Sequence, residues 1–176
     1  MKILKNLNIF TLFIILLSGC DAIKKNAATA EISDKDKCTQ VKTLIAHHKD
    51  GFKDLKGNIH ITSRMDIWDA KYDLVGENCQ IWRWSNGKQA YMCSLTVPNK
   101  EIAIEKQKQA ISFSKQCLGN EWQTENIERE HGRAFRTIFS QAENKTVASI
   151  HRVKTEGLFK SEWAIYYFIG DRDNSL

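Results

Sequence analysis

The chain has 176 residues, a formal net charge of +5 and 42% hydrophobic residues, which suits one ordinary domain with a real core. The positive charge is mild and forms no basic stripe, so nothing in the sequence indicates nucleic-acid binding. One proline and nine glycines make a long disordered segment unexpected outside a short tether. The composition excludes neither an enzyme nor a binding module, so the distinction depends on the motifs.

The N-terminal segment 1–19 has the layout of a secretory signal peptide. Lys2 and Lys5 form a short basic region, and the apolar run 9–17 follows it. This run is too short to span a bilayer as a helix. We therefore expect segment 1–19 to be removed, which lowers the formal charge from +5 to +3 because both lysines leave with it.

The end of the apolar run, Leu17-Ser18-Gly19-Cys20, resembles the lipobox of bacterial lipoproteins. Ser18 and Gly19 are small enough for a peptidase site, and Cys20 supplies a thiol for lipid. The resemblance implies a mature protein that begins at Cys20 and carries a diacylglyceryl group, usually with a third acyl chain. The alternative is an ordinary cleaved signal with a chance cysteine, but no other cleavage site fits as well.

A lipid on Cys20 would place the protein on a membrane of the bacterial envelope. Each buried methylene contributes about 0.8 kcal/mol, so two or more acyl chains hold a protein stably. Asp21 stands next to the cysteine, and in enteric bacteria an aspartate there tends to retain a lipoprotein in the inner membrane, with the outer membrane still possible. Residues 20–33 predict a polar tether, residues 34–170 one periplasmic domain, and residues 171–176 a tail.

The first helix is predicted to start at Ser33, which is a good N-terminal cap followed by acidic residues. Its apolar face follows three- and four-residue steps and consists of Cys38, Val41, Leu44, Ile45, His48 and Phe52. Gly51 and Gly57 end this region. Two strands are expected next, over 58–63 and 68–74.

A β-hairpin is predicted over 79–97, because Ser-Asn-Gly-Lys at 85–88 separates two strand patterns. A two-residue turn would set Cys79 opposite Ser94, with the thiols of the hairpin facing apart. A three-residue loop, with its glycine in the left-handed conformation, would set Cys79 opposite Cys93. Only the second arrangement permits a cross-strand disulfide.

Four cysteines remain after lipidation, an even number in an oxidising compartment, and they predict two disulfides. They are Cys38, Cys79, Cys93 and Cys117. Their spacings match no zinc pattern and include no CxxC. Three connectivities are open, and the hairpin favours Cys79–Cys93 with Cys38–Cys117.

The second half of the chain repeats this order of elements. A helix over 100–118 is predicted, capped by Asn99 and stopped by Gly119. Three strands are expected after it, over 133–139, 146–153 and 162–169. Helices followed by strands predict an α+β fold, with two helices packed on an antiparallel sheet. The similar rhythm of 80–97 and 136–153 also suggests a helix-plus-meander repeat.

Few residues are candidates for catalysis. His47 and His48 are adjacent on a helix, so they cannot readily chelate one ion. Glu128, Glu130 and His131 cluster near a predicted turn and could transfer protons, although a solvated loop is the commoner explanation. No hydrolase elbow, metalloprotease helix or nucleotide-binding loop is present. We therefore assign no catalytic residue, cofactor or metal, and keep a periplasmic hydrolase as the alternative function.

Aromatic and basic residues of the hairpin are the better functional candidates. Trp82 and Trp84 share one strand face, flanked by Arg83 and Lys88, and Tyr91 would join them only with a two-residue turn. Such side chains often fill a core. Aromatic residues with arginine are also typical of protein-binding hot spots. The sequence thus favours a non-catalytic module that binds an envelope protein, as an assembly factor, toxin-immunity protein or inhibitor.

Overall fold

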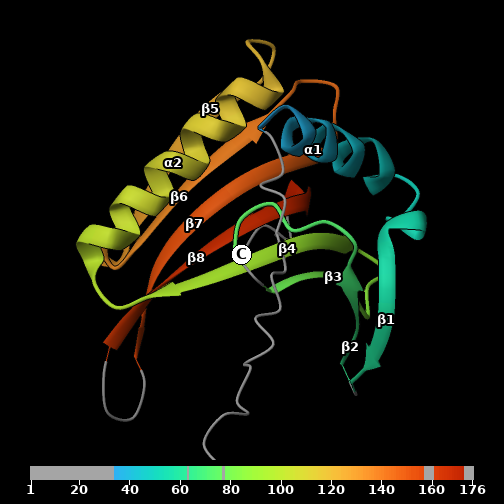
Figure 1. Cartoon of the computed structure of the whole chain (residues 1–176), viewed down its shortest axis with the longest axis horizontal. Helices are drawn as coiled ribbons and strands as arrows, with labels where there is room; N and C mark the ends of the chain where they lie inside the picture. The colour runs from blue at the N-terminus through green and yellow to red at the C-terminus, as the bar shows by residue number, and fades with distance from the viewer. Residues whose placement is uncertain (1–33, 63, 77, 157–160, 173–176) are drawn as a thin grey trace, which may run out of the picture. The chain divides into compact units, whose positions relative to one another are not determined.

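The computed structural model describes residues 34–62, 64–76, 78–156 and 161–172 (Figure 1). The predicted signal peptide 1–19, the lipidation site Cys20 and the tether 20–33 lie outside the described residues. The last four residues of the predicted tail lie outside them as well. Among the residues that are described, no helix is both long and apolar enough to cross a membrane.

Two α-helices pack on one antiparallel sheet, as the sequence predicts, and the sheet is the larger part of the fold. The elements in chain order are α1 (Asp34–His48), β1 (Lys56–Ile61), β2 (Met65–Ala70), β3 (Asn78–Trp84), β4 (Gln89–Val97), α2 (Lys100–Leu118), β5 (Gln123–Arg129), β6 (Ala134–Ser140), β7 (Thr146–Glu156) and β8 (Ser161–Asp171). Short 3₁₀ turns precede β1 and β6. The strand order is β1-β2-β3-β4-β8-β7-β6-β5, so two four-stranded meanders join where β4 pairs with β8.

The bounds of α2 agree with the sequence prediction because both ends carry local signals. The Asn99 side chain accepts a hydrogen bond from the Ile102 N–H at 2.9 Å. At the other end, Gly119 has φ 79° and its N–H donates to the Lys115 carbonyl. Helix α1 ends earlier than its apolar pattern, at His48, and Phe52 reaches the core from the following turn with φ 56°.

Both helices lie on the same face of the sheet (Figure 1). Between them and the sheet lies the main core, whose largest fully buried side chains are Tyr91, Tyr167, Phe52, Phe139, Leu44, Ile81, Ile150, Ile165, Ile169 and Val41. The Cys38–Cys117 disulfide joins α1 to α2, with Cα atoms 4.8 Å apart. The helices are therefore fixed to each other as well as to the sheet.

The β3–β4 hairpin adopts the three-residue loop. Gly87 has φ 81° and its N–H donates to the Trp84 carbonyl at 2.9 Å. The register sets Cys79 opposite Cys93, and the two form a disulfide with Cα atoms 4.0 Å apart. The disulfide connectivity is thus the one that the hairpin argument favours.

The strand predictions differ from the structure in three places. Strands β1 and β2 begin two to three residues before the predicted 58–63 and 68–74. Strand β8 extends to Asp171, so the predicted tail begins inside the sheet. The sequence predicts no strand between the second helix and residue 133, but β5 pairs with β6 along its whole length, Gln123–Arg129. It is the outermost strand and almost all of its side chains are exposed, so no apolar alternation marks it.

Candidate functional site

The two hairpin tryptophans lie on the sheet face opposite the helices. Side chains alternate along a strand, and Ile81, which precedes Trp82 and so lies on the other face, belongs to the main core on the helix side. Trp82 is paired with Ile67 of β2, and Trp84 with Met65. These four half-buried residues, Met65, Ile67, Trp82 and Trp84, form what we call the aromatic patch. The two indole rings meet edge to face, with centroids 6.0 Å apart.

Tyr91 does not belong to this patch, because the three-residue loop turns it to the helix side. It is fully buried, its hydroxyl donates to the Tyr72 carbonyl at 2.9 Å, and it accepts from the Leu74 N–H at 3.2 Å. Burial raises the pKa of this hydroxyl above its usual range. Tyr91 is therefore a core residue in this structure, and it does not join Trp82 and Trp84 on their face.

Arg83 also lies on the helix side of the sheet, where its side chain is exposed. Its Nε donates to Asp66 Oδ2 at 3.0 Å, and a second guanidinium nitrogen contacts the same oxygen. The guanidinium lies 5.3 Å from the Trp68 ring, and Lys56 Nζ lies 3.8 Å from that ring. Arg83 is thus engaged in a cross-strand ion pair on the opposite face from Trp82 and Trp84.

An apolar strip continues the patch toward the centre of the same face. Ala90, Ile138, Val147 and Phe168 are buried together, with Trp84 and Ile127 packed against them. Gly170 makes room for this cluster: a Cβ there would come within 2.7 Å of the Ala90 methyl and 2.9 Å of the Phe168 ring. The apolar strip therefore links the aromatic patch on β2–β3 to strands β6 and β7.

Ser149 and His151 form a buried pair further along β7, on the same face. Ser149 Oγ lies 2.8 Å from His151 Nε2, and the histidine is 5% exposed. Burial, with smaller effects of Arg136 and Arg129, lowers the pKa of His151 to about 3. At neutral pH the imidazole is therefore neutral, and it shares a hydrogen bond with the Ser149 hydroxyl. The Ser-x-His spacing inside a strand is a sequence signal that could have revealed this pair. Because both side chains are buried, we assign the pair a structural role.

The buried His151 should make folding stability depend on pH. Its folded pKa lies below its ordinary value of 6.5, so its contribution is present above pH 6.5 and is lost as pH falls toward 3. We expect the free energy of unfolding to fall by about 2.5 kcal/mol between pH 7 and pH 4.5 from this group. Urea unfolding at both values measures it. His151→Gln should remove most of that difference, and an unchanged pH dependence in the variant would contradict the assignment.

Of the Glu128, Glu130 and His131 cluster, the structure describes the side chains of Glu128 and His131, and both are exposed. Glu128 belongs to β5 rather than to a turn, and its carboxylate lies against Gly132, where a Cβ would come within 3.2 Å of it. His131 is exposed, with φ 53°. The side chain of Glu130 lies outside the described part of the structure.

His48 has a structural role at the end of the sheet. Its Nδ1 lies 2.7 Å from Thr146 Oγ1, and its Nε2 lies 3.5 Å from Asp171 Oδ2. These contacts join α1 to the start of β7 and the end of β8. Within the described ranges, no group of three or more His, Cys, Asp or Glu side chains is arranged to hold a metal ion.

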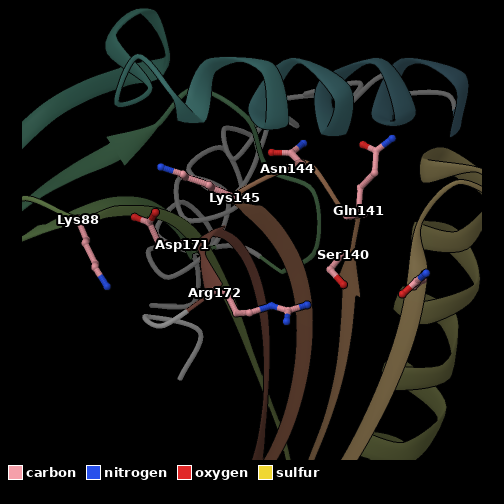
Figure 2. A pocket seen from close by; sticks show the side chains of 9 residues that line it. Lys88, Ser140, Gln141, Asn144, Lys145, Asp171 and Arg172 are labelled. Carbon is pink, nitrogen blue, oxygen red and sulfur yellow. The ribbon is translucent and has the colours of Figure 1, made fainter.

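A polar pocket of about 500 Å³ opens at this end of the sheet (Figure 2). Its lining comes from the β3–β4 turn, the β6–β7 turn, and the ends of β5 and β8. The lining residues are Lys88, Gln123, Ser140, Gln141, Ala142, Asn144, Lys145, Asp171 and Arg172. Lys88 is the only one of the five sequence-predicted partner residues that lines it.

In comparisons with known proteins, no family model, no curated protein and no solved structure matches this chain. Of the predicted partner residues, only Trp82 and Trp84 come together. Sequence reasoning missed Met65 and Ile67, which only the β2–β3 register brings to the same face.

Proposed function

We propose that this chain is a non-catalytic module that binds another protein through the sheet face opposite its helices. The observation that carries the proposal is the aromatic patch, in which Trp82 and Trp84 lie beside Met65 and Ile67 on a face that neither α1 nor α2 covers. Half-buried tryptophans supply large apolar area with few rotatable bonds. They are therefore enriched among the residues that contribute most to protein–protein affinity.

Charge on the same face narrows the chemistry of the partner. Arg129 and Arg136 project from β5 and β6 on the patch side, as their pairing with Ala134 and Ile127 places them. Arg136 already interacts with Glu125 within the chain. A partner that fits would therefore present an apolar projection to the aromatic patch and an acidic group to Arg129. Complementary charge of this kind raises the rate at which two proteins associate and fixes their orientation in the complex.

We also propose that the protein is anchored by lipid to a membrane of the bacterial envelope, on the periplasmic side. The lipobox-like end of segment 1–19 supports anchoring through Cys20, and Asp21 favours the inner membrane over the outer. Two disulfides support an oxidising compartment such as the periplasm. An assembly factor, a toxin-immunity protein and an inhibitor each fit a small anchored binding module.

The lipid anchor gives the first test. Cys20→Ser should abolish lipidation and leave an unprocessed precursor, because the thiol that accepts the diacylglyceryl group is gone. Mass spectrometry of the native protein should find a diacylglyceryl cysteine at the mature N-terminus. A mature terminus at any other residue, without lipid, would show that the anchor is wrongly assigned.

Binding is tested by crosslinking the full-length lipidated protein in its own envelope and identifying what it captures. We expect one dominant protein, captured by the native chain and lost with Trp82→Ala and Trp84→Ala combined. The matched control is Glu130→Gln with His131→Ala, which should capture the partner as well as the native chain does. The opposite result would be a Glu130→Gln, His131→Ala variant that folds but no longer functions in the cell, and a tryptophan variant that still functions. In that case the hydrolase alternative takes precedence over the binding module.

We also propose that the two halves descend from one helix-plus-meander unit. Each half has the order helix then four strands, and the last strands of the two halves, β4 and β8, pair with each other. This arrangement supports an internal repeat whose two copies share a single continuous sheet.

A further inference from the structure

The pocket at the end of the sheet differs in chemistry from the aromatic patch. Among the described residues that line it, none is aromatic, and Ala142 is the one apolar residue. Figure 2 shows the labelled side chains around the opening, with Arg172 extending in the direction of Ser140 in this view. An apolar ligand would gain little here, so the pocket suits a hydrophilic one.

Positive charge exceeds negative charge among the described residues of the lining. Lys88, Lys145 and Arg172 are cationic, and Asp171 is the one acidic residue among the nine. The Asp171 carboxylate also faces His48, whose Nε2 is 3.5 Å away. The pocket therefore favours a ligand that carries at least one negative charge.

Amide and hydroxyl groups provide the rest of the lining. Asn144 is held in place because its Oδ1 accepts from the Thr146 N–H at 2.9 Å, which leaves its NH₂ group as a donor. The Gln141 Nε2 donates to Glu121 at 3.3 Å, which leaves its carbonyl oxygen as an acceptor. With Ser140 and Gln123 they offer both donors and acceptors, and this mixture matches ligand hydroxyl groups.

We propose that this pocket binds a small acidic sugar, a hydroxyl-rich ring that carries a phosphate or a carboxylate. The volume of about 500 Å³ lies within the range of small-molecule sites and far exceeds that of one inorganic anion. The cationic side chains bind the acidic group, and the amides with Ser140 bind the hydroxyls. This site does not depend on the protein-binding role of the aromatic patch.

Isothermal titration calorimetry on the full-length chain in a nonionic detergent tests the proposal. The probes are glucose 6-phosphate, gluconate, glucose and inorganic phosphate. We expect saturable binding of glucose 6-phosphate or gluconate, at least tenfold tighter than that of glucose or inorganic phosphate. Comparing the two acidic sugars shows whether the preferred acidic group is a phosphate or a carboxylate.

Variants locate the binding. Lys145→Gln with Arg172→Gln should weaken it at least tenfold, while the control pair Lys108→Gln and Lys115→Gln, exposed on α2, should leave it unchanged. Lys88→Gln, at the hairpin turn, provides a second test should the double variant not fold. Absence of saturable binding to both acidic sugars, equal binding of inorganic phosphate, or full affinity in the folded pocket variants would overturn the proposal.

Discussion

Replacing both Cys38 and Cys117 by serine is expected to lower the free energy of unfolding by about 4 kcal/mol. A disulfide stabilises a fold mainly by restricting the unfolded chain, and the effect grows with the length of the closed loop. This bridge joins residues 79 positions apart, whereas the Cys79–Cys93 bridge closes a separation of only 14. Urea unfolding followed by tryptophan fluorescence measures the loss.

The second bridge is the matched control. Cys79→Ser with Cys93→Ser should cost about 3 kcal/mol, because it closes the shorter loop and lies inside one hairpin. Alkylation of the unreduced native protein should label none of the four cysteines. Labelling at two or more of them, or a larger loss from the hairpin pair than from the interhelical pair, would contradict the assignment.

Replacing both Trp82 and Trp84 by alanine is expected to weaken partner binding by about a hundredfold or more. Truncating one interface hot spot costs about 2 kcal/mol or more, and about 1.4 kcal/mol corresponds to a tenfold change in affinity. The two rings contact each other, so their effects need not add. The measurement is the dissociation constant for the partner identified by crosslinking.

Trp68→Ala is the control for losing a tryptophan elsewhere in the same sheet. Trp68 lies on the helix side, next to Lys56 and Arg83, so its removal should leave partner affinity nearly unchanged. Thermal unfolding of each variant separates lost contacts from lost folding. Equal loss of affinity from Trp68→Ala and from the patch variant would show that the binding surface is not the aromatic patch.

Local signals made parts of this fold predictable. Asn99 and Gly119 mark the ends of α2 because a cap and a left-handed glycine act within one helical turn. The hairpin loop followed from requiring Cys79 to meet Cys93. Strand β5 lacked such a signal, because an exposed edge strand needs no apolar alternation and is held by its pairing with β6.

The candidate sites were less predictable because distant segments form them. Trp82 and Trp84 were identified from their own strand, but Met65 and Ile67 join them through a pairing that no local pattern specifies. The polar pocket combines a hairpin turn with segments more than thirty residues further along the chain. Tyr91 shows how strongly the position of a side chain depends on the register of its strand. Adding one residue to the hairpin loop moves every side chain of one strand to the other face of the sheet.

The interhelical disulfide has a consequence for a chain that has been cut. Cys38 lies before the short connection between Val97 and Lys100, and Cys117 lies after it. A protease that cleaved this connection would produce two fragments still joined by one covalent bond and by the pairing of β4 with β8. The nicked protein would migrate as a single species until a reductant released its halves, so proteolytic damage there would stay hidden on a non-reducing gel.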